Sequence, residues 1–151
     1  MATSPSRPFR SFTYPYTKVE WGSNSDIAPM AKAVLSWKGE KASVDMLMDT
    51  GANRTFLLSG MAERLGLEVS SETQTAMAGG GTLKVRRAKV EVTLMEPLPN
   101  GRIGRKHLVD PVLIAEEGAL PFPVLGRKPL LRWYDLKLSE RNLTFSLSEA
   151  P

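Results

Sequence analysis

The stretch of the sequence that points most clearly to chemistry runs from Val44 to Asn53. There an apolar strand leads directly into an acidic residue, Asp49, followed by a small hydroxyl and a glycine. A carboxylate at the end of a buried strand is costly unless it is hydrogen-bonded or partnered, and Gly51 permits a turn that brings its own amide to that carboxylate. The hydroxyl of Thr50 can lock the same loop. We therefore expect Asp49 to be held rigidly, with its oxygens facing outward.

The elements that must position this loop are those of an all-β domain, because short apolar runs alternate with turn signals along most of the chain. Alternating apolar residues predict a hairpin that ends at Asp49, with strands over 33–37 and 44–48 and a turn over 38–41. A short helix is expected next, over 61–66.

The second half of the chain predicts longer strands. In the run 82–94 the apolar residues occupy odd positions up to Val85 and even positions from Ala88 onward. This shift in the apolar alternation predicts a bulge or a strong twist between Val85 and Ala88. The following strand, over 106–115, contains Pro111, and we expect this proline at an edge or an irregularity of the sheet.

The last elements are a short helix and a hairpin. Pro129 stands where a late helix is expected to begin, and the final hairpin is predicted to pair 134–138 with 143–147. His107 is expected to be a strand or surface histidine, because the sequence has no Gly-x-Ser-x-Gly nucleophile elbow to accompany it.

The composition bounds the domain organisation and removes several other chemistries. Residues 1–26 mix aromatic side chains with Pro and Ser, which predicts an extended or flexible N-terminal arm before one domain over 27–151. The 151 residues include no cysteine and one histidine, which excludes a thiol nucleophile, disulfides and Cys- or His-rich metal centres. The net charge of +4 comes from scattered Lys and Arg, so nucleic acid is not an expected partner. No apolar run approaches the ~20 residues of a membrane span, and we expect a cytoplasmic protein.

Asp49-Thr50-Gly51-Ala52 resembles the active-site signature of aspartic proteases, in particular of their retropepsin-like, single-domain branch. Two further stretches occur in the order typical of that family. The glycine-rich run from Met77 to Val85 stands where the family has its flap, and Gly80 to Arg86 is similar to the descending flap strand. Val124 to Leu131 resembles the family's apolar-apolar-Gly-Arg element. The resemblance implies an all-β, retropepsin-like closed barrel with a flap hairpin and one or two short helices, assembled as a homodimer.

The resemblance also implies a role for each residue of these stretches. Asp49 is the implied catalytic residue, Thr50 would hydrogen-bond across the dimer axis, and Gly51 would offer its carbonyl to an extended peptide substrate. The resemblance implies neither a metal nor an organic cofactor, and the implied nucleophile is water. The remaining implied residues are Thr50, Gly51 and Ala52 for loop support, Gly51, Ala52, Asn53, Arg54, Ala78, Gly79, Gly80, Gly81 and Thr82 for substrate binding, and Leu125, Gly126 and Arg127 for structure.

The number of active-site motifs bears on stoichiometry. Peptide hydrolysis by this chemistry requires two carboxylates that share one proton. The sequence holds one Asp-Thr-Gly and is too short for a duplicated lobe. An active enzyme would therefore be a homodimer in which each copy gives one Asp49.

The sequence also departs from the retroviral pattern. Many retroviral relatives carry an acidic residue where this chain has Asn53, so we expect a hydrogen bond to Arg127 in place of an ion pair. The next residue, Arg54, suggests acidic groups on the substrate. The helix expected over 61–66 is closer to cellular and bacterial members, and the arm over 1–26 is extra: a propiece, a dimer strand, a tether or a substrate.

Two readings other than a protease remain open at this point. A catalytically inactive retropepsin fold could serve as a dimerisation or peptide-binding module. Alternatively, Asp49-Thr50-Gly51 could be a plain Asx-type turn that closes a hairpin.

Overall fold

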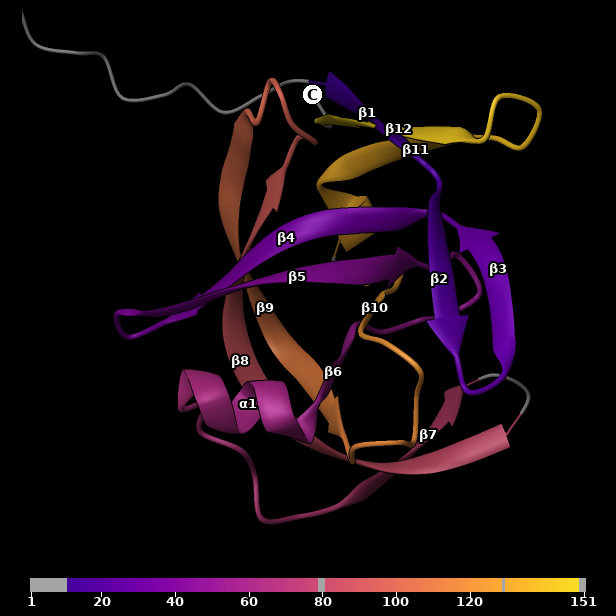
Figure 1. Ribbon diagram of the computed structural model, residues 1–151. Helices are drawn as coiled ribbons and strands as arrows, with labels where there is room; N and C mark the ends of the chain where they lie inside the picture. Colours follow the sequence, from indigo (N-terminus) through magenta and orange to yellow (C-terminus); the bar gives the residue numbers. More distant parts are fainter. Residues whose placement is uncertain (1–10, 79–80, 129, 150–151) are drawn as a thin grey trace, which may run out of the picture.

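A computed structural model describes residues 11–78, 81–128 and 130–149 of the chain, and it is mostly β, as the sequence predicts (Figure 1). The strands of the N-terminal half are β1 (Ser11–Pro15), β2 (Thr17–Trp21), β3 (Asn24–Ala28), β4 (Met30–Trp37), β5 (Glu40–Met48) and β6 (Phe56–Leu58). Those of the C-terminal half are β7 (Gln74–Ala78), β8 (Gly81–Met95), β9 (Ile103–Ala115), β10 (Val124–Leu125), β11 (Tyr134–Ser139) and β12 (Thr144–Glu149).

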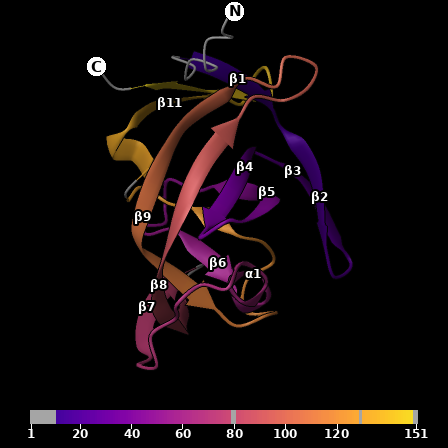
Figure 2. The same ribbon diagram turned by 90° about the vertical axis from the view of Figure 1, so that its left-hand side faces the viewer.

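Seven strands form the main sheet, in the order β4-β5-β10-β6-β9-β8-β7. Because β4 pairs with β8 as well as with β5, the hydrogen-bonded order returns to its starting strand. A three-stranded sheet, β1-β12-β11, lies at the top of Figure 1, and β2 and β3 form a separate hairpin. In Figure 2 this β2–β3 hairpin stands apart from the other strands.

The hairpin β4–β5 confirms the predicted strand–turn–strand unit that ends at Asp49. Its two turn residues, Lys38 and Gly39, have φ angles of 46° and 89°. A two-residue hairpin turn with positive φ at both positions matches the right-handed twist of the strands that it joins. The first strand begins at Met30, three residues before the predicted start.

The predicted bulge between Val85 and Ala88 is wrong. Pairing with β9 is continuous there, from Val85 opposite Ala115 to Ala88 opposite Val112. The apolar alternation shifts because the buried face of β8 changes along the strand: Val85 is buried on one face and Ala88 on the other, while Arg86 and Arg87 between them are exposed. Val85 and Ala115 pack in a small cluster with Phe56, whereas Ala88 and Val112 belong to the main core.

The irregularity lies instead at Pro111, as expected for a proline inside a sheet. Ala88 faces Val112 and Val90 faces Val109, so β9 has one extra residue opposite Lys89. A second register shift falls between Thr93 and Met95 of β8.

Helix in the described ranges is confined to α1 (Ser59–Leu65) and the 3-10 turn η1 (Leu130–Arg132). The first confirms the expected helix and ends at Gly66, whose φ of 67° suits glycine. The second stands where the late helix was expected, although Pro129 itself lies outside the described residues. No helix of the described ranges is both long and apolar enough to cross a bilayer.

The C-terminal hairpin β11–β12 confirms the predicted pairing, and it also binds part of the N-terminal segment. Strand β1 pairs with β12, and the buried Tyr14 ring stacks on Phe145 at a centroid distance of 4.8 Å. The Tyr14 hydroxyl donates a hydrogen bond of 2.5 Å to the Met95 carbonyl. Residues 11–28 are thus extended, and β1 shares the main core.

Candidate active site

Asp49 follows the last residue of β5 directly, and its backbone is fixed by a segment far away in the sequence. Strand β10 runs parallel to β5, with Leu125 opposite Met48. The amide of Asp49 donates a hydrogen bond of 3.0 Å to the Leu125 carbonyl. The parallel pairing therefore extends onto the acidic residue itself.

The loop turns back on the Asp49 carboxylate, as the sequence predicts. The amide of Gly51 donates to Oδ1 of Asp49 at 2.9 Å, and the amide of Ala52 donates to the Asp49 carbonyl at 3.2 Å. Asp49 is half-buried, whereas Thr50 and Gly51 are exposed. Within the described ranges the Thr50 hydroxyl makes no hydrogen bond, so the expected locking of the loop by this hydroxyl is not seen; the residue faces solvent instead.

A buried hydroxyl that the sequence reasoning missed supports the other side of the loop. Thr55 has 1% of its surface exposed, and its hydroxyl donates to the Lys128 carbonyl at 3.2 Å while accepting from the Gly126 amide at 3.3 Å. Gly126 touches the loop backbone so closely that a Cβ there would lie 2.0 Å from the carbonyl oxygen of Arg54. Only glycine fits at this position.

Asn53 and Arg127 interact as the sequence predicts. The Arg127 guanidinium donates a hydrogen bond to Oδ1 of Asn53, so a hydrogen bond to a neutral amide stands where an ion pair was the alternative. Backbone bonds run alongside it, from the Arg127 amide to the Ala52 carbonyl at 2.8 Å and from the Lys128 amide to the Asn53 carbonyl at 2.9 Å. These contacts join residues 52–54 to residues 126–128.

A cavity of about 500 Å³ opens beside Asp49. Leu47, Phe56 and Val124 line it from the sheet, and Leu120 and Phe122 line it from the segment before β10. Met77 of β7, which is 80% exposed, is a further bulky apolar side chain in the lining of this cavity. Asp49 is the one carboxylate among the described residues of this lining.

The predicted flap corresponds to the hairpin β7–β8. Ala78 pairs with Gly81, and the predicted Gly79 and Gly80 lie outside the described residues. Met77, which pairs with Thr82, lines the Asp49 cavity, whereas Gly81 and Thr82 are not among the described residues that line it.

Eight of the predicted site residues fall into three groups, to which Thr50, Gly81 and Thr82 do not belong. Asp49, Gly51 and Ala52 line the cavity, Asn53 and Arg54 line a neighbouring one, and Leu125, Gly126 and Arg127 hold the loop from behind. Residues 34–127 match the family model of aspartyl proteases, and this range is more than half of the chain. The chain belongs to the aspartyl protease family. The comparison with curated proteins found no match.

The match places the Asp49 loop, the β7–β8 hairpin and the Gly126-Arg127 pair inside one family region. Sequence reasoning missed Thr55, Phe56 and Met77, since nothing in their local pattern shows that they meet Asp49. In the described ranges, His, Asp and Glu side chains form no group of three or more that could hold a metal ion.

His107 lies on β9 and is not among the described residues that line the Asp49 cavity. Its ring stacks on Trp133 at 4.0 Å, and its Nε2 lies 3.2 Å from the Tyr134 hydroxyl. Burial lowers the pKa of His107, with a smaller contribution from Arg105. Burial raises the pKa of Tyr134 to about 12. Neither His107 nor Tyr134 is among the described residues that line the Asp49 cavity, so neither offers a general base there.

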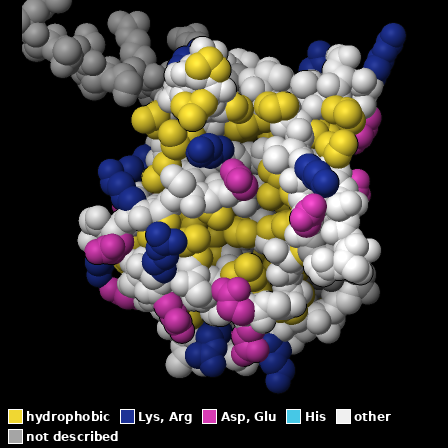
Figure 3. All heavy atoms as spheres, in the orientation of Figure 1, with side chains coloured by type: hydrophobic (Ala, Val, Ile, Leu, Met, Phe, Trp, Pro, Cys, Tyr) yellow, Lys and Arg dark blue, Asp and Glu magenta, His cyan; other side chains and the backbone are white. Residues whose placement is uncertain are grey.

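Figure 3 shows how apolar and charged side chains are distributed over one face of the molecule. Apolar side chains gather in the middle of the face, and charged side chains of both signs surround them. The largest buried side chains, among them Leu35, Met46 and Leu94, lie beneath the strands in the main core.

Proposed function

We propose that this aspartyl protease is a retropepsin-like endopeptidase whose active unit is a homodimer. Water is activated between two Asp49 carboxylates, one from each protomer, and a peptide bond of an extended substrate is hydrolysed. The observation that carries the proposal is the Asp49 loop: a half-buried carboxylate, fixed by the Gly51 amide, that lines a cavity in which it is the one carboxylate of the described lining.

The chemistry follows from two carboxylates that share one proton. Like charges in close contact cannot both ionise easily, so one carboxyl group stays protonated. The ionised carboxylate takes a proton from water, and the water oxygen attacks the carbonyl carbon while the second carboxyl protonates the carbonyl oxygen. A proton then passes to the amide nitrogen, the C–N bond breaks, and the carbonyl re-forms as a carboxylic acid.

The surroundings of Asp49 support the partner and substrate roles. Thr50 and Gly51 are exposed, so a hydroxyl and a carbonyl are free to meet a second protomer and a peptide backbone. The β7–β8 hairpin, with Met77 at the cavity, acts as a flap that closes on the peptide and excludes water. The circular strand order of the main sheet supports a closed barrel, and α1 favours the cellular and bacterial branch.

The experiment compares the parent protein with Asp49→Asn and Asp49→Ala on a peptide library and on peptides of residues 1–26. Both variants are expected to lose cleavage and to keep the melting temperature and the oligomeric state of the parent. Asp45→Asn is the matched control, because Asp45 is an exposed carboxylate of the same strand outside the cavity lining. Cleavage by either Asp49 variant at the parent's rate would refute the proposal.

A mixing experiment tests the shared site separately from the need for Asp49. Parent and Asp49→Asn proteins are mixed in equal amounts and left to exchange subunits. If each active site needs an intact Asp49 from both copies, about a quarter of the parent activity per dimer remains. If each protomer acts alone, about half of it remains. A loss of activity that is linear in the fraction of variant would exclude a shared dyad.

A further inference from the structure

A second cavity, of about 390 Å³, lies next to the Asp49 cavity and shares the side chains of Phe56 and Met77 with it. Two of its lining residues are charged, Arg54 and Arg87, and the described lining includes no carboxylate. We call it the Arg54–Arg87 pocket. A substrate that lies across the Asp49 cavity and continues past Phe56 enters it.

The β8–β9 register shows why Arg87 belongs to this pocket and its neighbour does not. Side chains alternate between the two faces of a strand, so Arg87 shares a face with Val85, and both line the pocket. Arg86 lies on the opposite face and lines a different hollow, together with Glu116 and Glu117. Carboxylates therefore line the hollow of Arg86, whereas none is among the described residues that line the Arg54–Arg87 pocket.

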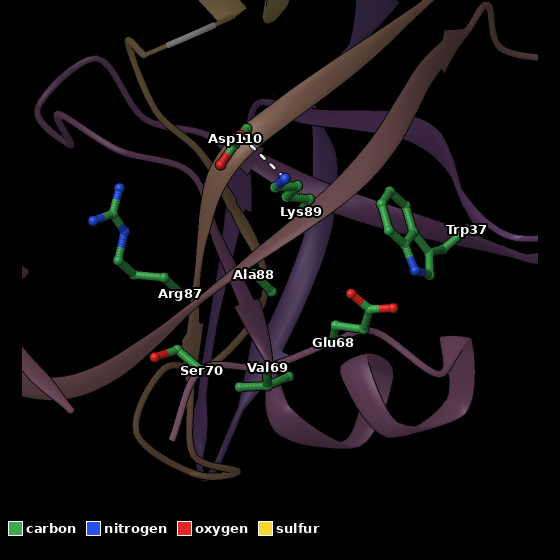
Figure 4. A pocket seen from close by; sticks show the side chains of 8 residues that line it. All are labelled: Trp37, Glu68, Val69, Ser70, Arg87, Ala88, Lys89 and Asp110. Carbon is green, nitrogen blue, oxygen red and sulfur yellow. Dashed lines mark ion pairs between the residues drawn. The ribbon is translucent and has the colours of Figure 1, made fainter. Parts of the chain in front are cut away.

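Neither pocket arginine has an acidic partner among the described residues: no ion pair and no side-chain hydrogen bond joins Arg54 or Arg87 to a carboxylate. Arg87 also lines the hollow that holds Trp37 and Glu68, and Figure 4 shows its side chain extending away from those two side chains. The carboxylate of Asp110 in the same view is bound to Lys89 at 3.9 Å. Two exposed guanidinium groups are thus left to interact with a ligand.

We propose that the Arg54–Arg87 pocket binds an acidic side chain, Asp or Glu, of the peptide substrate; the proposal rests on the proposed function. Guanidinium groups pair with carboxylates through charge-assisted, often bidentate hydrogen bonds. Asp49 and Arg54 are five positions apart, so they lie at most about 18 Å from each other, a distance that an extended peptide covers in about five residues. The acidic residue therefore lies within about five positions of the bond that is cut.

The dimer doubles this preference. A twofold axis through the two Asp49 loops puts one Arg54–Arg87 pocket on each side of the scissile bond. Substrates with an acidic residue on both sides are therefore preferred over substrates with one.

The experiment uses peptide pools in which one position at a time is fixed as Glu, Gln or Lys. With the parent protein, Glu in the responsive position is expected to raise kcat/KM on the order of tenfold over Gln, and the gain shrinks at high salt. Arg87→Glu and Arg54→Glu are expected to reverse the order of the Glu and Lys pools. Arg86→Glu, the matched control on the other face, keeps the parent's ratio.

Binding of the same pools to Asp49→Asn protein separates this proposal from the proposed function. Tighter binding of the Glu pool that depends on Arg87 upholds the pocket, even if the parent protein cuts nothing. Equal values for Glu and Gln at every position overturn it, and so does an equal change of the ratio in Arg86→Glu and Arg87→Glu. Tighter binding of single-stranded nucleic acid than of any peptide, lost in Arg87→Glu, also overturns it.

Discussion

Substituting Gly126 with alanine tests the physical link between the late segment and the Asp49 loop. An added Cβ would lie 2.0 Å from the Arg54 carbonyl oxygen and 2.8 Å from that of Ala52, and both obstacles are backbone. Ordinary van der Waals contact begins near 3.4 Å, so the two segments must move apart by more than 1 Å. No rotation of a side chain can relieve the clash.

The cost follows from what that movement breaks. Overpacking of this kind costs ~1–3 kcal/mol. Separation also strains the bond from the Lys128 amide to the Asn53 carbonyl and the one from the Gly126 amide to the Thr55 hydroxyl, at ~1 kcal/mol each. The free energy of unfolding should fall by about 3–5 kcal/mol, and the melting temperature of a chain of this size by about 10 °C or more.

Activity should fall further than stability predicts. The residue before Gly126, Leu125, accepts the hydrogen bond of the Asp49 amide, so the shift passes directly to the acidic residue. A misplacement of ~1 Å at a catalytic group costs on the order of 100-fold in rate. The assay is peptide cleavage at a temperature where the variant is folded, together with thermal unfolding at a fixed protein concentration.

Gly66→Ala is the matched control for this experiment. Gly66 has a φ of 67° and no atom within 4 Å of an added Cβ, so the substitution adds backbone strain alone, ~1 kcal/mol, and lowers the melting temperature by about 3 °C. Cleavage by the folded Gly66→Ala protein should equal that of the parent. If Gly126→Ala proves as stable and as active as Gly66→Ala, the close contact does not hold the Asp49 loop and the reasoning fails.

Three further changes have expected outcomes. Asn53→Asp turns the hydrogen bond to Arg127 into an exposed ion pair, which should add ~0.5 kcal/mol at low salt and nothing at 1 M salt, as thermal unfolding would show. Because burial lowers the pKa of His107, the unfolded chain binds more protons than the folded one below pH 6.5. The free energy of unfolding therefore falls as the pH drops through that range. His107→Gln should flatten the profile of this free energy between pH 7.5 and 5. Phe56→Ala empties the wall between the two cavities and should cost ~3–5 kcal/mol in chemical denaturation; a loss below ~1 kcal/mol would show that Phe56 is not packed as described.

The parts of the fold that the sequence predicted are those fixed by local physics. Lys38 and Gly39 demand a tight hairpin turn, Gly66 ends a helix, and the Asp49 loop closes on an amide two residues away. Each of these features involves neighbours in the sequence. Local patterns are therefore enough to place them.

The errors have a shared cause in long-range pairing. A shift in the apolar alternation at Val85 indicates either a bulge or a change of the buried face, and only the position of Phe56 against β9 decides between them. Thr55 and Met77 belong to the Asp49 site through contacts with strands that no local pattern reveals. The same limit hid Arg87, which joins Arg54 only after β7, β8 and β9 have paired.

The dependence of the Asp49 loop on β10 also sets an order of events during synthesis. The groups that fix residues 49–55 are carried by Leu125, Gly126 and Lys128, more than 70 residues later in the chain. Contacts of such sequence separation form only after the intervening loop has closed. A nascent chain that has not yet released residue 128 from the ribosome therefore has the acidic residue but no rigid site around it. The late position of this support delays the assembly of the Asp49 site until residue 128 has been made.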